Sequence, residues 1–468
     1  MSTSGDQMPP PLIVLFPSSG MGHLTPFLRL AVSLASLSVR VTLIVPPPIS
    51  LAESQSLSHF SSAFPQIAQE HLPLLPSDVV SLNTSEDPFY GHYEAIRRSA
   101  SRCLPPLLSP PPSAVVTDMS LASAVIPVTK HLGITNFVLF TSSARMLTLF
   151  ASFHSIIGRE EETGDVVRIP GMEAIPRSWV PPPLLADEQS LLKTHIIENG
   201  EKIAESDGIL INTFQNIELD SLTALNSGRV VRALPPVSPI GLLPPCHAFE
   251  RREQSQIQSE ILAWLDQQPV NSVVLVSFGS RTAMSKDQIR ELGEGLVTSE
   301  WRFVWMVKEK KVDREDAGEL SQVLGEGLLK RVREKGLVLK GWVNQEEVLS
   351  HQAVGGFLSH CGWNSVSEAI WHGVPVLAWP QHGDQKMNAR VVERIGLGVW
   401  VKEGGWGGGG VIKGEEIRKS VSEMMQSGIL KEKASEAREE ARRAVGEGGS
   451  SRKGLKEIIE NLGQPFGG

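Results

Sequence analysis

The chain has 468 residues, and a single hydrophobic core seldom extends over that length, so two domains are expected. Hydrophobic residues make up 41% of the sequence and charged residues 21%, which is the balance of a globular protein and excludes a disordered or fibrous one. The formal net charge of -8 argues against a general nucleic-acid or anionic-membrane binder, although local backbone dipoles can still hold a small anion.

The cysteines and the N-terminus indicate the cellular compartment of the protein. Cys103, Cys246 and Cys361 are far apart and form no C-x-x-C pair, so neither a disulfide framework nor a structural zinc site is expected. The first residues lack a basic segment and carry an apolar run too short for a signal peptide. No stretch approaches the roughly 20 apolar residues of a membrane span. We therefore expect a cytoplasmic protein with no membrane span. A monomer is expected as well, although nothing in these features decides the oligomeric state.

The first half of the chain alternates strands and helices. An apolar run at 12–17 stops at a Pro and the turn SSGMGH, and a second strand is predicted at 39–47. The helical pattern between them places on one face Leu24, Phe27, Leu28, Ala31 and Leu34. Such a strand–helix–strand unit implies a parallel sheet. Further strands are predicted in SAVVTDMS, NFVLFTSS and GILINTF.

A Pro-rich segment at 234–249 and the polar stretch ERREQSQIQSE mark a domain boundary. Beyond it a second α/β series is predicted, with the strands SVVLVSFGS, RFVWMVK, GLVLKGW, VGGFLSH and VPVLAWP. We expect a domain at 1–240, a linker at 241–258, a second domain at 259–445 and a C-terminal segment at 446–468 that packs back on the first domain. EGGWGGGG is interpreted as a surface loop, and KEKASEAREEARRA as a solvated helix. Two facing doubly wound domains would place a ligand cleft at the carboxyl ends of both sheets.

The stretch from Trp342 to Gln385 carries the clearest functional signal. It begins WVNQEEVLSH, continues through FLSHCGWNSVSEAI and ends AWPQHGDQ. It resembles the sugar-nucleotide signature of plant UDP-dependent glycosyltransferases, and the one visible departure is Asn344, where the family usually has Pro. The resemblance implies an α/β fold of the GT-B type, with two facing Rossmann-like, doubly wound domains and a cleft between them. It also implies that the first domain binds the acceptor and the second the UDP-sugar.

The chemistry of UDP agrees with this resemblance. An indole can stack on uracil, a carboxylate such as Glu368 can accept hydrogen bonds from both ribose hydroxyls, and a helix N-terminus supplies donors to the pyrophosphate. The predicted UDP-binding residues are Ser280, Trp342, Val343, Gln345, His360, Trp363, Asn364, Ser365 and Glu368. Asp384 and Gln385 match the pair that reads the hydroxyls of the transferred sugar, and Thr141 matches a sugar-contacting position, although a strand-end turn explains Thr141 equally well.

His23 and Asp118 are the predicted catalytic residues. His23 lies at the head of the first predicted helix, where the helix dipole favours a neutral imidazole suited to a general base. Asp118 ends a strand and could orient the ring and stabilise the imidazolium. In the family this dyad deprotonates the acceptor, which then displaces UDP with inversion.

The sequence gives weaker support to two other possibilities, an oxidoreductase and a metal site. The sequence GMGH hints at a dinucleotide-binding fold, but the third Gly of that fingerprint is missing and no acidic residue ends the second strand, which argues against an oxidoreductase. No set of His, Asp and Glu has metal-ligand spacing, and the donors in SFGS and HCGWNS could neutralise the leaving group without Mg²⁺. We therefore expect no metal and no cofactor besides UDP-glucose as co-substrate.

Several stretches resemble plant C-glucosyltransferases of 2-hydroxyflavanones and dihydrochalcones such as phloretin. They are SEDPFYGHYEAIRRSA, TSSARMLTL, SFGSRTAMSKDQIRELGEGL and AWPQHGDQKMNARVVERIGLGVW. Met119 and Tyr90 depart from that subgroup, which usually has Ile and Phe there. Phe16, Phe89 and Met119 are candidate walls of a flat acceptor pocket, and each fits a core position equally well.

We therefore expect a UDP-glucose-dependent C-glucosyltransferase that acts on a small polyphenol and binds no nucleic acid. The alternatives are O-glucosylation of the same acceptors and, from another class, a non-catalytic UDP-sugar-binding protein.

Overall fold

The computed structural model describes residues 9–75, 88–156, 164–185, 191–250, 256–279, 281–308, 319–340, 343–402 and 410–462. The chain divides into two compact units. The first comprises Met1–Arg177, Pro182–Cys246 and Ala444–Gly468, and the second comprises Ser178–Pro181 and His247–Arg443. The division after Cys246 falls inside the segment predicted as a linker.

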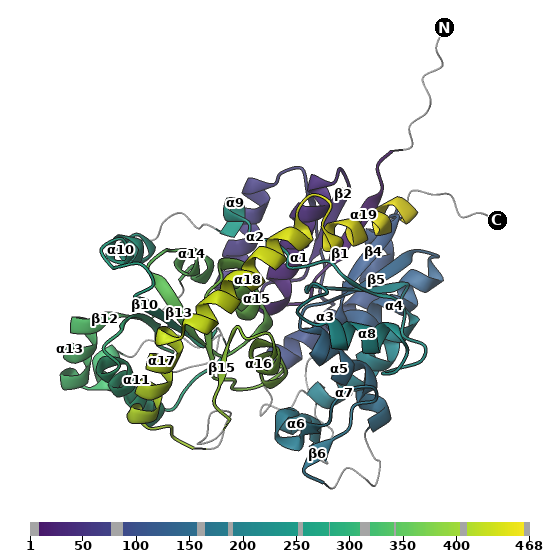
Figure 1. Ribbon diagram of the computed structural model, residues 1–468. Coiled ribbons are helices and arrows are strands. Elements are labelled where there is room, and N and C mark those ends of the chain that lie inside the picture. Colours follow the sequence, from purple (N-terminus) through teal and green to yellow (C-terminus); the bar gives the residue numbers. More distant parts are fainter. Residues whose placement is uncertain are drawn as a thin grey trace. The chain divides into compact units, whose positions relative to one another are not determined.

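The first unit is built on a seven-stranded parallel sheet with the order β3-β2-β1-β4-β5-β8-β9. Figure 1 labels its strands β1, β2, β4 and β5. Its strands are β1 (Leu12–Phe16), β2 (Arg40–Val45), β3 (Ala68–His71), β4 (Ala114–Asp118), β5 (Thr135–Phe140), β8 (Gly208–Ile211) and β9 (Val237–Pro239). A separate antiparallel pair consists of β6 (Val166–Val167) and β7 (Ile175–Pro176). The sheet is parallel because each strand is followed by a crossover, and its apolar runs are buried.

Helices cover this first sheet. They are α1 (Met21–Ser36), α2 (Leu51–Ala63), α3 (Pro88–Leu107), α4 (Ala122–His131), α5 (Ala144–Ile156), α6 (Pro182–Leu185), α7 (Leu191–Lys202), α8 (Leu219–Asn226) and the C-terminal α19 (Ser450–Leu462). The predicted apolar face of α1 is confirmed, since its five predicted residues are all buried. The α19 residue Ser451 donates a hydrogen bond of 2.6 Å to the carbonyl of Gly241, so the end of the chain is anchored to the first unit.

The second unit repeats this architecture with a six-stranded parallel sheet of order β12-β11-β10-β13-β14-β15. Its strands are β10 (Val273–Ser277), β11 (Arg302–Met306), β12 (Gly336–Leu339), β13 (Val354–Ser359), β14 (Val376–Ala378) and β15 (Gly398–Trp400). Its helices are α9 (His247–Glu250), α10 (Gln256–Leu265), α11 (Lys286–Thr298), α12 (Leu320–Leu324), α13 (Glu326–Lys335), α14 (Gln345–Leu349), α15 (Trp363–His372), α16 (Gln385–Arg394), α17 (Gly414–Gln426) and α18 (Gly428–Val445).

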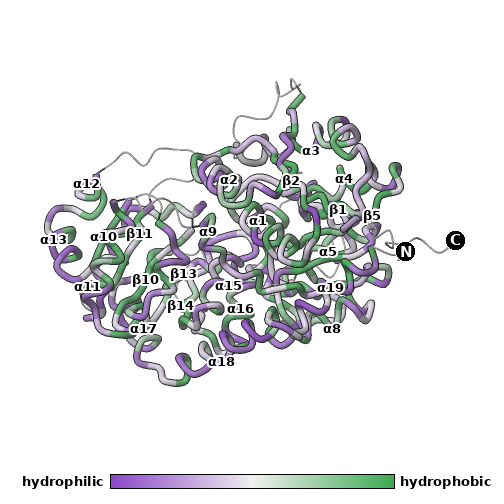
Figure 2. The backbone as a smooth tube through the Cα atoms, turned by 90° about the horizontal axis from the view of Figure 1, so that it is seen from above, coloured by the Kyte–Doolittle hydropathy of each residue, from purple (hydrophilic) through white to green (hydrophobic). Residues whose placement is uncertain are grey.

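Apolar burial holds each unit together. Every residue of β10 and β13 is buried, and each Val or Leu side chain removed from water contributes roughly 1.5–3 kcal/mol. Figure 2 shows this pattern, with hydrophobic colouring concentrated on the strands and hydrophilic colouring prominent on the outer helix α18. The solvated helix predicted at 431–444 is confirmed as part of α18. Of the predicted glycine-rich loop at 403–410, residues 403–409 lie outside the described part of the chain.

Candidate active site

The strand order of the first sheet decides where its functional side chains gather. β1 lies between β2 and β4, so the crossover from β1 runs to one side of the sheet and the crossover from β4 to the other. In doubly wound sheets ligands bind beyond the carboxyl ends of the strands at such a reversal. The turn after β1 reaches α1 through Gly20, whose φ of 99° is accessible to glycine at little cost. That turn places His23 in the first turn of α1.

His23 and Asp118 form a hydrogen-bonded pair at this reversal. Nδ1 of His23 lies 2.9 Å from Oδ2 of Asp118, although the two residues are 95 positions apart in sequence. The His23 side chain is 23% exposed, whereas the Asp118 side chain is fully buried at the end of β4. With Nδ1 donating to the carboxylate, Nε2 is the ring nitrogen that can accept a proton.

The surroundings of Asp118 keep it ionised. Burial by itself would raise the pKa of this carboxyl group, but the charge and hydrogen bond of His23 and two hydrogen bonds from Ser120 outweigh burial. The net result is a pKa below the ordinary value for aspartate. A fixed anion beside an imidazole favours the protonated ring, which is the state that a general base reaches after it has taken a proton.

The structure brings Thr141 to the same pair. Thr141 follows β5, is buried, and its Oγ1 lies 3.3 Å from Nδ1 of His23. Met119 follows Asp118 directly and is partly buried. Phe16 is fully buried in the core cluster beneath α3 and α4, so for this residue the core position has the stronger support. The side chain of Phe89 lies outside the described part of the structure.

The second unit presents the junction that the sequence predicted. β13 ends at Ser359, a turn follows, and α15 begins at Trp363 with Gly362 as its N-cap. Glycine has no side chain, so Gly362 makes no side-chain capping hydrogen bond to α15. The N-terminus of a helix can bind an anion through its first backbone N–H groups, and α15 is suited to this role. Trp363 and Ser365 are buried in the first turns of the helix, while Asn364 is partly exposed.

The His360 side chain packs closely against two glycines, Gly279 and Gly362. A Cβ added to Gly279, in the turn after β10, or to Gly362 would lie 2.6 Å from Nε2 of His360, so both positions must be small. Burial, together with the neighbouring His382, lowers the pKa of His360 to about 3. The imidazole is therefore neutral at physiological pH and can offer a hydrogen bond without a full charge.

Gln345, Ser365 and Glu368 meet as one group. The Nε2 atom of Gln345 donates to Oγ of Ser365 at 2.9 Å and to Oε2 of Glu368 at 2.8 Å. Gln345 begins α14, whereas the other two residues lie on α15. This contact aims the Glu368 carboxylate, which accepts hydrogen bonds and suits a vicinal diol such as ribose.

Asp384 and Gln385 open α16, and Asn388 lies one helical turn further on. Nδ2 of Asn388 donates to Oδ2 of Asp384 at 2.8 Å and to the carbonyl of Cys361 at 3.0 Å. Oε1 of Gln385 accepts hydrogen bonds from the backbone N–H groups of Gln381 and His382. Asn388 thus connects the predicted sugar-reading carboxylate to the turn before α15, a role that the sequence analysis missed.

The departure from the family pattern at Asn344 has a structural explanation. Asn344 is the N-cap of α14, its Oδ1 accepts from the N–H of Glu347 at 3.3 Å, and its Nδ2 donates to the carbonyl of Glu250 at 3.1 Å. Val343 beside it is buried. Ser280 and Trp342 lie outside the described residues, so their predicted contacts with UDP stay predictions.

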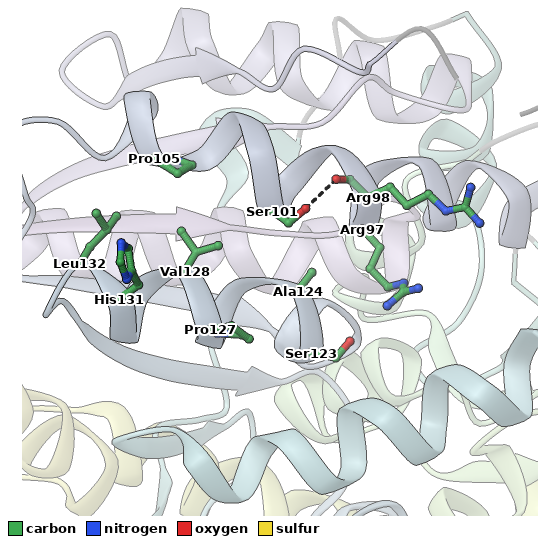
Figure 3. Close-up of a pocket in the computed structure, with 10 residues that line it drawn as sticks. All are labelled: Arg97, Arg98, Ser101, Pro105, Ser123, Ala124, Pro127, Val128, His131 and Leu132. Atoms are coloured by element: carbon green, nitrogen blue, oxygen red, sulfur yellow. Dashed lines mark hydrogen bonds between the residues drawn. The ribbon is translucent and has the colours of Figure 1, made fainter. Parts of the chain in front are cut away.

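A surface hollow of about 630 Å³ lies between α3 and α4 (Figure 3). Its lining includes Arg97 and Arg98, and both guanidinium groups pair with the carboxylate of Glu94. None of the predicted site residues lines this hollow. The dyad, with its buried carboxylate and accessible imidazole, is the stronger candidate for chemistry.

No helix in the ranges given above is long and apolar enough to cross a membrane. Within those same ranges, no three His, Cys, Asp or Glu side chains are grouped so that they could hold a metal ion.

Comparison with known proteins identifies the family. Residues 246–432 match the family model described as UDP-glucoronosyl and UDP-glucosyl transferase. UDP-glycosyltransferase 708G2 of Citrus unshiu is 52% identical, and UDP-glycosyltransferase CGT of Oryza sativa subsp. japonica is 46% identical, each over 98% of both chains. The crystal structure of LpCGTa in complex with UDP superposes with a TM-score of 0.85 at 42% identity, covering 97% of this chain and 100% of that one.

These matches confirm the predicted fold class of two parallel-sheet, Rossmann-like domains of the GT-B type. They also confirm that a UDP-sugar donor is the co-substrate to expect for such a chain. The chain therefore belongs to the plant UDP-glycosyltransferases, and it is a glycosyltransferase enzyme.

Proposed function

We propose that this enzyme transfers glucose from UDP-glucose to a carbon of a phloroglucinol-type ring in a flavonoid acceptor, with inversion at the anomeric carbon. The relatives and neighbours that carry CGT in their names support the C-glucosyltransferase part of this proposal. The observation that carries the mechanism is the 2.9 Å hydrogen bond between His23 and the fully buried Asp118.

In the proposed reaction, Nε2 of His23 takes the proton of a phenolic hydroxyl. The resulting phenolate is nucleophilic at the ring carbons ortho to the oxygen, and one of these forms the new bond to the anomeric carbon. The bond from that carbon to the UDP oxygen breaks, and the electron pair leaves with the diphosphate. Loss of the proton from the attacked ring carbon restores the aromatic ring as a phenolate. The phenolate oxygen takes back the proton held by His23, so the net products are the C-glucoside, UDP and the one proton lost from the ring carbon.

Asp118 supports this step in two ways. Its carboxylate holds the imidazole in the tautomer that exposes Nε2, and its negative charge stabilises the imidazolium after proton transfer. On the donor side we propose that Glu368 binds the ribose and that the N-terminus of α15, with His360 and Ser365, binds the diphosphate. Asp384 and Gln385 are proposed to bind the hydroxyls of glucose.

The product of a reaction with UDP-glucose and phloretin tests the proposal. A C-glucoside survives acid hydrolysis and fragments across the sugar ring in tandem mass spectrometry, whereas an O-glucoside loses the whole sugar. An acid-labile product would overturn the C-transfer and leave the dyad intact. Absence of product with a range of phenols, together with tight binding of UDP, would instead favour the non-catalytic binding protein.

Metal independence, the cytoplasmic location and the monomeric state stay predictions. Activity that is unchanged by EDTA would support the first, and activity that EDTA abolishes and Mg²⁺ restores would contradict it. Sedimentation of the purified protein decides the oligomeric state.

A further inference from the structure

One oxygen of the Asp118 carboxylate does not contact His23. While Oδ2 accepts from the imidazole, Oδ1 accepts two hydrogen bonds from Ser120, one from its backbone N–H at 2.8 Å and one from its hydroxyl at 2.5 Å. Ser120 lies in the short 3-10 helix Met119–Leu121 that continues from β4, and Asp118 is its N-cap. The two carboxylate oxygens are therefore held by different partners, and this arrangement prevents the carboxylate from rotating.

Behind Ser120 lies a second layer of buried polar side chains. Tyr93, from α3, is 4% exposed, and Asn199, from α7, is 1% exposed. Nδ2 of Asn199 donates to the Tyr93 hydroxyl oxygen at 3.2 Å and to the carbonyl of His195 at 2.7 Å. Oδ1 of Asn199 accepts from the backbone N–H of Ser123 at 2.8 Å. Asn199 therefore has little freedom to move, and it holds the Tyr93 hydroxyl in place.

Burial is the main cause that raises the pKa of Tyr93, and the charge of Asp118 raises it further, whereas hydrogen bonding to Asn199 and Ser120 and the charge of Arg97 lower it. The phenol consequently stays protonated, so it can act as a hydrogen-bond donor. The other charged or titratable groups around this phenol are Arg97 and Glu94 on α3 and His195 on α7, and the Arg97 side chain appears in Figure 3.

We propose that Ser120 is a positioning residue of the transfer reaction, and that Asn199, through its hydrogen bonds to the N–H of Ser123 and to Tyr93, supports the segment that carries Ser120. This proposal rests on the proposed catalytic role of His23 and Asp118. The carboxylate itself accepts hydrogen bonds from His23 on α1 and from Ser120 after β4. Their function is to keep Asp118 ionised and aimed at Nδ1 of His23 while the imidazole gains and loses its proton.

The test is the variant Ser120→Ala in the full-length enzyme, compared with Ser120→Thr. Loss of the hydroxyl should lower kcat about tenfold, because a hydrogen bond to a charged group is worth at least that factor. KM for UDP-glucose should not change, because Ser120 belongs to the first unit and the predicted UDP-binding residues belong to the second. Ser120→Thr retains the hydroxyl and should recover most of the activity.

The pH profile supplies a readout that a purely structural role would not change. The Ser120 hydrogen bonds favour the ionised form of Asp118 and contribute to its lowered pKa, so their partial loss raises that pKa. Because catalysis requires both a neutral His23 and an ionised Asp118, weaker stabilisation of the carboxylate in Ser120→Ala should move the acid limb of the kcat profile to higher pH. Tyr93→Phe should give a smaller shift in the same direction. The matched control is Ser123→Ala, because Oγ of Ser123 is buried without a hydrogen-bond partner and the variant retains the backbone N–H.

The possible outcomes distinguish failure of the positioning role of Ser120 from failure of the catalytic role proposed for His23 and Asp118. If His23→Ala is inactive while Ser120→Ala has wild-type kcat and a wild-type acid limb, the positioning role is wrong and the dyad stands. If Ser120→Ala and Ser120→Thr are equally impaired, the hydroxyl is not what matters and the positioning role is also wrong. If His23→Ala retains wild-type turnover, the dyad fails and the positioning role fails with it.

Discussion

The dyad region of the first unit and the donor region of the second are built on the same fold in different ways. His23, Asp118 and Thr141 come from three separate strand ends, and 118 positions separate Thr141 from His23. Gln345, Ser365, Glu368, Asp384 and Asn388 instead come from one continuous stretch of chain. In the first unit, the strand order brings together residues that are distant in sequence. In the second unit, the candidate residues lie at the starts of helices that follow successive strands, so they are close in sequence.

The two regions also differ in what their buried polar groups do. Asp118 is held by donors that keep it charged, which suits the proton transfer proposed for the first unit. His360 is kept neutral by its surroundings and lies three residues before the start of α15, which suits the anion binding proposed for the second unit. The comparison predicts that substitutions in the first region lower kcat, and that substitutions in the second lower donor affinity.

The largest effect is expected at His23. His23→Ala removes the general base, and we expect kcat to fall about a thousandfold, within the range that general-base catalysis contributes. Affinity for UDP, measured by isothermal titration calorimetry, should stay at the wild-type value. If His23→Ala turned over a polyphenol at a near-normal rate, the first region would not determine kcat, and the proposed difference between the two regions would be wrong.

The next largest effect is expected at Glu368. Glu368→Ala removes a carboxylate proposed to accept two ribose hydrogen bonds, and we expect UDP to bind about 10- to 100-fold more weakly. At saturating donor, kcat should change little. Glu368→Gln is the matched variant, since it keeps the size and loses the charge. Unchanged UDP affinity in both variants would show that the ribose assignment is wrong.

The variant Asn388→Ala tests whether Asn388 orients Asp384 for recognition of the sugar. The variant removes the contacts from Nδ2 to Asp384 and to the carbonyl of Cys361, and with them a constraint on the carboxylate that we propose binds the sugar. We expect kcat/KM for UDP-glucose to fall about tenfold, the cost of losing a hydrogen bond to a charged group. The preference for UDP-glucose over UDP-galactose, measured in competition, should fall as well. A preference that stays at the wild-type ratio would contradict this role.

The smallest effect is expected at Asn344. Asn344→Ala removes an N-cap, which typically costs about 1 kcal/mol of stability. Chemical denaturation should detect this loss, while affinity for UDP should remain within twofold of the wild type. A large loss of UDP affinity would mean that this cap is part of the donor site.

Local spacing made much of the second unit predictable from the sequence. Apolar runs predicted β10, β11, β12, β13 and β14, and the donor signature predicted the strand-to-helix junction at His360. β3 and β15 were missed, because AQEH has no apolar run and GVW is too short for a periodic signal. Asn388 was missed as well, although its spacing of four residues from Asp384 on a helical pattern was a usable signal.

The polar layer behind the dyad was not predictable in the same way. Tyr93 and Asn199 are 106 positions apart and lie on different helices, and no periodicity in either segment indicates that they meet. The contact depends on how α3 and α7 pack, which a single sequence does not specify. Ser120, two residues after Asp118, was within reach of sequence reasoning, because a short polar side chain after a strand-end aspartate often bonds back to it.

The variant Asp118→Asn tests the central claim most directly, since it keeps the shape of the dyad and removes its charge. We predict that kcat with UDP-glucose and phloretin falls at least about a hundredfold, because the amide favours the wrong imidazole tautomer and does not stabilise the imidazolium. The dissociation constant for UDP, measured on the same preparation, should not change. Wild-type turnover by Asp118→Asn would contradict the dyad mechanism, and with it the view that the first unit is arranged for proton transfer.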